Sequence, residues 1–237
     1  MSSIKGVTTH LLDMMIPLVG PALVFLIEGG AERILVDAGV GGPEALIRAL
    51  AAKGLKPKDI DTVIITHLHF DHADNVGLFP HARFILQKKE WEYARSPLPI
   101  QRSLYDPNTI AELEMLNLVL VEDGFSVVPG VQVILVPGHT QGQQAVVVNT
   151  GAGPYVIAGD LLYSYLNIYP EIAEFTDMLG NKIRCTPQPD HDFYPPGIHT
   201  DLTEWYKSVE RVLSLAGSRE RIIPGHDPQV VGKIFPD

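Results

Sequence analysis

The sequence predicts an α/β protein of one domain that contains two β-sheets. Short runs rich in valine and isoleucine recur along the chain between turn residues, which is typical of strands. Two longer segments instead show the 3.6-residue spacing of amphipathic helices. The 237 residues, 46% of them hydrophobic, can bury a sizeable core, and no internal repeat or low-complexity linker divides them. We therefore expect a single domain over residues 1–237.

The candidate strands are short apolar runs bounded mainly by glycine, proline, asparagine or aspartate. Their number exceeds what one ordinary sheet holds, so two sheets are expected. They span residues 6–12, 22–28, 33–37, 62–66, 83–87, 118–121, 131–136, 144–150, 155–158 and 221–223.

Helical spacing predicts two helices. The first opens with Pro43 in its first turn, ends before Gly54 and has an apolar face formed by Leu46, Ile47, Leu50 and Ala51. The second begins at Asp201, which together with Glu204 resembles a capping box, and ends at Gly217. Its apolar stripe, which we interpret as core, comprises Leu202, Trp205, Val209, Val212, Leu213 and Ala216.

Two segments, 96–108 and the proline-rich 166–200, lack clear periodicity. Segments of this length inside a compact domain are usually functional or disordered. They are candidates for the walls of a pocket, and plain surface insertions are the alternative.

The charge balance and the hydrophobic pattern exclude several classes of protein. A formal net charge of -10 argues against binding to nucleic acid, which requires clustered lysine and arginine. The apolar stretch 14–27 is too short to span a membrane and is interrupted by prolines and a glycine. The single cysteine, Cys185, excludes an internal disulfide and fits a reducing compartment. Because no signal-peptide pattern is present, we expect a cytoplasmic protein.

A cluster of histidines and aspartates, T-H-L-H-F-D-H, follows the strand expected at 62–66. In extended backbone alternate residues share a side, so His67 and His69 can converge on one metal ion. Asp71 and His72 follow where the chain turns, and could hold a second ion. Mixed imidazole and carboxylate ligands favour zinc, with manganese, iron or cobalt as alternatives. The cluster alone is compatible with one metal ion or with two.

Three other strand ends present side chains of the same kind. Apolar runs lead into P-G-H at His139, into G-D at Asp160 and into P-G-H-D at His226. The glycine at each junction permits a tight turn beside a crowded site. Together with the cluster, these junctions predict one shared metal site.

These motifs together resemble the metallo-β-lactamase superfamily. The matching elements are H-L-H-F-D-H at 67–72, the downstream His139, Asp160 and His226, and Asp37 in I-L-V-D-A-G. The resemblance implies a four-layer αββα sandwich of two mixed sheets with helices on the outer faces, and two divalent metal ions at the sheet edges. It also implies that Asp160 bridges both ions and that Asp37 orients ligands. The first ion would be bound by His67, His69 and His139, and the second by Asp71, His72 and His226.

A finer resemblance is to the N-acyl-homoserine lactonase branch, on the stretches 71–94, 137–143 and 224–227. The D-x-x-Y pattern from Asp160 to Tyr163 matches one that, in this branch, places a tyrosine hydroxyl over the substrate. The resemblance implies opening of a lactone ring, which for N-acyl-homoserine lactones is called quorum quenching. Asp74 stands where many relatives have glycine, and no motif marks an acyl-chain pocket. The sequence therefore leaves the specific lactone open.

The ligand chemistry predicts a mechanism. Two cations that share a water lower its pKa, so that a bridging hydroxide can attack an ester carbonyl near neutral pH. The Tyr163 hydroxyl would help to stabilise the oxyanion, and a packed tyrosine with a backbone-bonded hydroxyl is the alternative. Asp160 or Asp71 would pass a proton to the leaving ring oxygen.

Other functions are compatible with the same ligands. The substrate could be a thioester, as in hydroxyacylglutathione hydrolases, another lactone or a β-lactam, and a non-catalytic metal-binding scaffold is the alternative outside enzymes. A homodimer is compatible with the sequence. Candidates for an acyl-chain wall, or for core packing, are Met14, Met15, Ile16 and Phe70. The histidines that match no ligand position, and that we expect in surface or structural roles, are His10, His81, His191 and His199.

Overall fold

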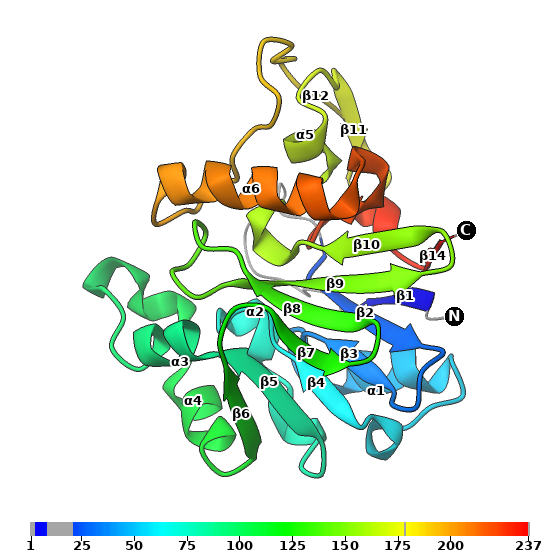
Figure 1. Cartoon of the computed structure of the whole chain (residues 1–237), viewed down its shortest axis with the longest axis vertical. Coiled ribbons are helices and arrows are strands. Elements are labelled where there is room, and N and C mark those ends of the chain that lie inside the picture. Colours follow the sequence, from blue (N-terminus) through cyan, green and yellow to red (C-terminus); the bar gives the residue numbers. More distant parts are fainter. Residues whose placement is uncertain (1–2, 9–20, 178, 237) are drawn as a thin grey trace.

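Two main β-sheets pack face to face, with helices on both outer faces (Figure 1). The computed structural model describes residues 3–8, 21–177 and 179–236. The first sheet contains, in spatial order, β14 (Ile234–Phe235), β1 (Ser3–Thr8), β2 (Leu23–Glu28), β3 (Ile34–Val36), β4 (Thr62–Ile64), β5 (Arg83–Gln87) and β6 (Asn117–Val121). The second contains β13 (Ile222–Ile223), β10 (Gly153–Ile157), β9 (Gln144–Thr150), β8 (Val131–Leu135) and β7 (Phe125–Val128). A separate hairpin consists of β11 (Glu174–Thr176) and β12 (Lys182–Arg184).

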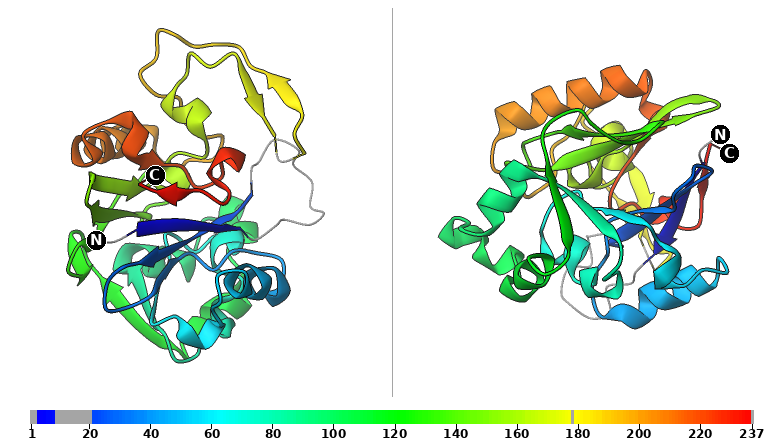
Figure 2. Two further views of the ribbon diagram at one scale, coloured as in Figure 1. Left: turned by 90° about the vertical axis from the view of Figure 1, so that its right-hand side faces the viewer. Right: turned by 60° about the horizontal axis from the view of Figure 1, so that its bottom comes forward.

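The helices lie outside the sheets. Those near the first sheet are α1 (Pro43–Ala51), α2 (Phe70–Ala73), α3 (Lys88–Ala94) and α4 (Pro107–Leu113). The long α6 (Leu202–Ala216) covers the second sheet, and the short α5 (Tyr165–Ile168) lies near it (Figure 2). Short 3-10 turns are found at Pro57–Asp59, Val76–Leu78, Pro99–Leu104, Gly159–Leu161, Arg219–Arg221 and Pro228–Val230. Among the described residues, no helix is long and apolar enough to cross a membrane.

Three hydrophobic clusters separate four layers. One cluster is built from strands of both sheets and fills the space between them. A second lies on the outer face of the first sheet and includes Leu46 of α1 and Leu113 of α4. The third lies on the outer face of the second sheet, where Trp205 of α6 packs. This is the αββα sandwich that the resemblance implies, and its central strands are buried on both faces.

Strand β2 shows how the sequence produces these layers. Successive side chains of a strand point to opposite faces. Leu23, Phe25 and Ile27 accordingly join the cluster between the sheets, whereas Val24 and Leu26 join the cluster beneath the outer helices. A strand that is buried on both faces has a continuous apolar sequence rather than an alternating one.

The strands expected from residue 22 onward are all confirmed, with ends that differ by two residues or fewer. The strand expected at 6–12 begins earlier, as β1 from Ser3, and residues 9–12 lie outside the described residues. Further strands, β7, β11, β12 and β14, were not expected. Each has two to four residues, too few for an alternation to be recognised, and each depends on pairing with a neighbouring strand.

The two expected helices are confirmed, with narrower buried faces than predicted. In α1 only Leu46 and Leu50 are buried, and Ile47 is 39% exposed. In α6 the side chain of Asp201 accepts hydrogen bonds from the backbone of Thr203 and Glu204, as an N-cap should. The remaining helices were not expected. They are four to seven residues long, and a 3.6-residue period needs more turns to be visible.

Candidate metal centre

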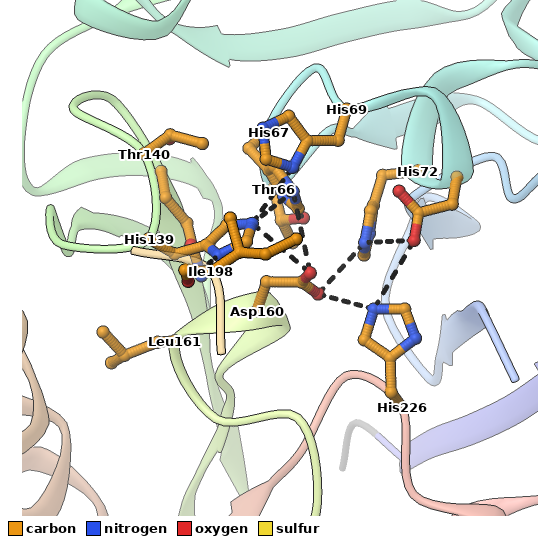
Figure 3. A network of polar contacts seen from close by, with 12 residues as sticks. Thr66, His67, His69, His72, His139, Thr140, Asp160, Leu161, Ile198 and His226 are labelled. Atoms are coloured by element: carbon orange, nitrogen blue, oxygen red, sulfur yellow. Dashed lines mark hydrogen bonds and ion pairs between the residues drawn. The ribbon is translucent and has the colours of Figure 1, made fainter. Parts of the chain in front are cut away.

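The seven candidate ligands gather where strands of both sheets end. Six of them, all except Asp71, are labelled in Figure 3. β8 and β10 are each antiparallel to β9, and β13 is parallel to β10, so these three strands run in the same direction. Their carboxyl ends therefore meet at one edge, and they are followed by His139, Asp160 and His226. From the first sheet, β4 ends at Ile64 and leads to His67 at the same edge.

Gln144 in β9 joins the two sheets beside this edge. Its backbone N–H donates to the carbonyl of Thr66 at 2.9 Å. Its side-chain amide donates to the carbonyls of Ile65 at 2.8 Å and Ile85 at 3.0 Å. The same side chain accepts a hydrogen bond from Gln87 at 3.0 Å. The partners all belong to the first sheet or its strand ends, so Gln144 holds the two halves of the site together.

His67, His69 and His139 form what we call the three-histidine group. Nε2 of His139 lies 3.2 Å from Nε2 of His67 and 3.0 Å from Nδ1 of His69. Zinc–nitrogen bonds of about 2.0–2.1 Å in a tetrahedral arrangement would place neighbouring nitrogens about 3.3 Å apart. The backbone of His69 is extended, with φ -64° and ψ 149°, which fits the expected convergence of His67 and His69. The nitrogen spacing of this group fits one metal ion.

The four-ligand group consists of Asp71, His72, Asp160 and His226. Asp160 faces both groups. Its Oδ1 lies 3.0 Å from Nε2 of His72 and 2.8 Å from Nε2 of His226. Its Oδ2 lies 3.4 Å from Nε2 of His139 and 3.9 Å from Nε2 of His67. The carboxylate is therefore oriented as a bridge between the groups (Figure 3).

Acceptors outside the two groups fix which ring nitrogen carries hydrogen. A carbonyl oxygen can only accept, so Nδ1 of His139 donates to the carbonyl of Ile198 at 2.8 Å. In the same way Nδ1 of His226 donates to the carbonyl of Pro21 at 3.1 Å. In a neutral imidazole the opposite nitrogen then carries the lone pair. In both residues that nitrogen is Nε2, which faces the candidate ligands, so these bonds orient the rings toward a cation.

Asp37 has the same effect on His72. Its Oδ2 accepts from Nδ1 of His72 at 2.8 Å and from the hydroxyl of Thr66 at 2.9 Å, and its Oδ1 accepts from the backbone of Thr66 at 2.7 Å. Because the Thr66 hydroxyl donates to Asp37, its oxygen can accept from Nδ1 of His67, which is 3.1 Å away. Asp37 has φ 65°, which aspartate tolerates better than most residues. The resemblance assigned this residue to orienting ligands, and its contacts agree.

Burial and neighbouring charges set the protonation of the site. Burial lowers the pKa of all three members of the three-histidine group, so these rings are neutral. Burial would also lower the pKa of His72 and His226, but nearby carboxylates, Asp160 first, raise it instead. Burial opposes ionisation of Asp160, yet the histidine charges outweigh burial and hold its pKa well below its usual value. In the four-ligand group the carboxylate of Asp160 and the two histidines thus shift each other's pKa in opposite directions.

Buried atoms without hydrogen bonds also indicate that the residues fit a metal ion. Nε2 of His72 and Oδ1 of Asp160 are buried, and within the described part of the chain neither forms a hydrogen bond, although they lie 3.0 Å apart. Leaving a buried polar group unpaired costs roughly 1–3 kcal/mol. A divalent cation would satisfy both atoms at once.

Tyr163 lies beside both groups. Its ring centroid is 5.7 Å from that of His139 and 5.2 Å from that of His226, and the residue is partly exposed. Burial, together with the charges of Asp160 and Asp71, raises the pKa of its hydroxyl, so the hydroxyl keeps its proton at neutral pH. Within the described residues this hydroxyl has no hydrogen-bond partner. The alternative, a packed tyrosine whose hydroxyl is hydrogen-bonded to the backbone, is therefore not what the described residues show.

His81, His191 and His199 belong to neither group. His81 contacts the carbonyl of Ile60 at 3.0 Å, and Nδ1 of His199 contacts the carbonyl of Pro196 at 3.2 Å. His191 is exposed. His10 lies outside the described residues, and so do the candidate wall residues Met14, Met15 and Ile16.

The two segments without clear periodicity both reach the site. Tyr105, from 96–108, places its ring 4.9 Å from that of His69. Ile198, from 166–200, supplies the carbonyl that holds His139. Phe70 lies within α2 between two candidate ligands and is 38% exposed, which leaves its side chain available to a substrate.

Several residues that shape the site were missed by the sequence analysis. They are Thr66, Gln144, Glu90 and the carbonyls of Pro21 and Ile198. Backbone carbonyls carry no sequence signal. Glu90 is fully buried whereas Glu92, two residues on, is exposed, and nothing in the sequence distinguishes the two.

Known proteins are similar to this chain in sequence. The family model Lactamase_B, the Metallo-beta-lactamase superfamily, matches residues 17–226. Over 130 residues the chain is 33% identical to an N-acyl homoserine lactonase of Bacillus sp, a match that covers 54% of this chain and 49% of the relative. Over 213 residues it is 32% identical to Metallo-beta-lactamase domain-containing protein 1 of Mus musculus, covering 87% of this chain and 64% of the relative. The matched region thus spans about half the length of the curated lactonases.

A solved structure extends the likeness to the fold. The crystal structure of a quorum-quenching N-acyl homoserine lactone lactonase superposes with a TM-score of 0.69 at 25% identity, over 96% of this chain and 92% of the other. The family model covers most of the sequence and includes all seven candidate ligands. This chain therefore belongs to the metallo-beta-lactamase superfamily.

Proposed function

We propose that this protein is a dinuclear metallo-hydrolase that opens the ring of an N-acyl-homoserine lactone. The observation that carries the proposal is the Asp160 carboxylate, which turns one oxygen toward each group of candidate ligands beside the Tyr163 ring. Zinc is the metal that the donor set favours. The residues that would hold the two ions are His67, His69 and His139 for the first, Asp71, His72 and His226 for the second, and Asp160 for both.

The chain's own residues prepare the site for an ester. When bound, the two ions lower the pKa of a shared water and polarise the substrate carbonyl. The hydrogen bonds of His139, His226 and His72 to their outer acceptors keep the three rings oriented while the substrate enters and leaves. The protonated hydroxyl of Tyr163 can donate a hydrogen bond to the oxygen that gains negative charge.

A carboxylate, of Asp71 or Asp160, would transfer a proton to the leaving ring oxygen. Asp71 is the more accessible of the two candidates, with a side chain 16% exposed, and its Oδ2 lies 3.7 Å from Nε2 of both His72 and His226. Asp160 is nearly fully buried between the groups. Either carboxylate can take the proton released by the attacking water and pass it to the leaving ring oxygen, which thereby becomes the alcohol of the product.

The substrate class is supported by the relatives. The identity of 33% to a Bacillus N-acyl homoserine lactonase covers about half of each chain.

A substrate panel tests the proposal. The zinc-loaded protein is assayed with homoserine lactones that carry short and long acyl chains, with a glutathione thioester and with a β-lactam. We expect lactone hydrolysis that is abolished in His67→Ala and in Asp160→Ala and retained in His81→Ala, a histidine outside both groups. Turnover of the thioester without turnover of any lactone would overturn the substrate class, and full activity of Asp160→Ala would overturn the mechanism.

A further inference from the structure

Glu90 is a buried carboxylate that the proposed mechanism does not use. It lies in the first turn of α3 and is fully buried. Its Oε1 accepts a hydrogen bond from the backbone N–H of Leu68 at 3.0 Å and from the hydroxyl of Tyr105 at 3.4 Å. Its Oε2 accepts from the hydroxyl of Thr140 at 2.6 Å. The backbone N–H of Gly142 also donates to this carboxylate.

The donors to Glu90 lie beside all three members of the three-histidine group. Leu68 stands between His67 and His69, so a bond to its N–H fixes the rotation of a peptide unit that links the two histidines. Thr140 directly follows His139. One carboxylate therefore connects the loop after β4 in the first sheet with the loop after β8 in the second.

Close packing leaves these loops little freedom to move around Glu90. A Cβ added to Gly142 would lie 2.0 Å from the backbone nitrogen of Glu90 and 2.3 Å from its Cα. The loop that carries His139 thus rests directly on the backbone of α3, which only glycine at this position permits. The side-chain bonds then set how that loop is rotated relative to the loop of His67 and His69.

The four-ligand group is oriented by other contacts. His72 is held by Asp37, and His226 by the carbonyl of Pro21. None of the hydrogen bonds to Glu90 comes from a residue adjacent to His226 or Asp160. A change at Glu90 should therefore act on one of the two proposed metal positions and leave the other intact.

We propose that Glu90 is a positioning residue that sets the spacing of the ligand nitrogens in the three-histidine group, through Leu68 and Thr140 and without contact to metal or substrate. This inference rests on metal binding by that group, as in the proposed function. A purely structural carboxylate would lower stability when replaced, but it would not select one metal position over the other.

The test is the binding and the visible spectrum of cobalt(II), which reports the geometry of its ligands. Glu90→Gln keeps the shape of the side chain and replaces one acceptor oxygen with a donor. Thr140→Val removes only the hydroxyl and keeps the volume, so it remains informative where Glu90→Gln folds poorly. Leu50→Ala, in the core beneath the first sheet, is the control for general destabilisation. Affinities of the two cobalt ions are measured by chelator competition, together with the melting temperature.

We expect both site variants to weaken one of the two cobalt ions about 10- to 100-fold and to change its absorption bands, while the other ion is retained. Leu50→Ala should have a lower melting temperature and an unchanged cobalt(II) spectrum. Wild-type affinities and spectra in both site variants would overturn the inference, and so would equal weakening of both ions. Because these readouts need no substrate, a wild-type protein that binds two ions but hydrolyses no lactone would overturn the proposed function alone.

Discussion

Three metal-facing histidines, His72, His139 and His226, are oriented by a hydrogen bond at the ring nitrogen that points away from the other candidate ligands. His139 and His226 donate to backbone carbonyls, which no substitution removes. His72 instead donates to the side chain of Asp37, which also accepts two hydrogen bonds from Thr66. Asp37 is therefore the residue at which this kind of support can be tested by mutation.

Asp37→Asn should weaken metal binding at the four-ligand group. An asparagine has one acceptor oxygen, so it cannot satisfy both Nδ1 of His72 and the backbone of Thr66, and its NH2 must face one of these donors. We expect a loss of affinity for one metal ion of about 10- to 100-fold, measured by chelator competition. Asp74→Asn is the matched control, because Asp74 is exposed and accepts from Gly41. Equal affinities in the two variants would contradict the role of Asp37.

Tyr163→Phe should lower kcat more than it changes KM. In the proposed mechanism the hydroxyl stabilises charge that develops during the reaction, and removing one such donor costs about 100- to 1,000-fold in kcat. Burial and the nearby carboxylates raise the pKa of this hydroxyl above the usual value for tyrosine. The hydroxyl therefore keeps its proton, and can donate a hydrogen bond, across the pH range of the assay. The ratio of wild-type to variant kcat should therefore stay constant from about pH 6 to pH 9. A ratio near one, or one that falls toward pH 9, would contradict this.

At the scale of elements, helix α6 begins against the turn that presents His139. The carbonyl of Gly138 accepts from the backbone of Thr200 at 2.6 Å and of Asp201 at 3.1 Å. A Cβ on Gly138 would lie 2.4 Å from Cα of Trp205. The P-G-H turn therefore requires glycine for two reasons: the α6 helix packs against it, and its backbone has a positive φ.

Gly138→Ala should destabilise the protein far more than Gly54→Ala. Both glycines have positive φ, but a Cβ on Gly54 meets nothing within 4 Å. The difference between the two variants combines the contact with α6 and the more strained backbone of Gly138, whose φ is 142° against 75° for Gly54. The contact alone is expected to cost about 1–3 kcal/mol. Urea unfolding followed by circular dichroism measures both free energies of unfolding. Equal losses would contradict the contact with α6.

The sequence predicts elements whose pattern is contained in a single segment, and it misses those that depend on distant partners. The strands from residue 22 onward and the helices α1 and α6 have enough residues for a period to be visible. Strand β14 has two residues and exists because it pairs with β1. The seven candidate ligands are recognisable in the sequence because four lie in one cluster and three follow strand ends, whereas the acceptor of His226, the carbonyl of Pro21, lies 205 residues away in the sequence.

At the scale of the whole molecule, the two sheets contribute different ligands. His67, His69, Asp71 and His72 follow β4 of the first sheet, and His139, Asp160 and His226 follow strands of the second. Each group contains residues from both sheets. A metal ion in either group would therefore cross-link the two halves of the sandwich.

Removal of the metal ions should lower the melting temperature of the whole protein in one cooperative transition. A ligand that binds the folded state alone adds about 4 kcal/mol at a free concentration 1,000 times its dissociation constant, or roughly 8–16 °C for a chain of this size. Calorimetry with and without a chelator measures the shift, and restored zinc should reverse it. In Asp160→Ala, which lacks the shared carboxylate, the shift should be much smaller. A chelator that leaves the wild-type melting temperature unchanged would contradict the cross-link.

The side chain of Gln144 gives the sandwich a resistance to shear that its apolar core does not provide. Contacts between apolar side chains have no preferred direction, so they oppose separation of the sheets more than sliding of one over the other. The hydrogen bonds that join Gln144 with Thr66, Ile65, Ile85 and Gln87 are directional, and a displacement by one residue would break all of them. The alignment of the two sheets at the proposed metal centre is thus built into the polypeptide, and metal ions would strengthen an alignment that already exists.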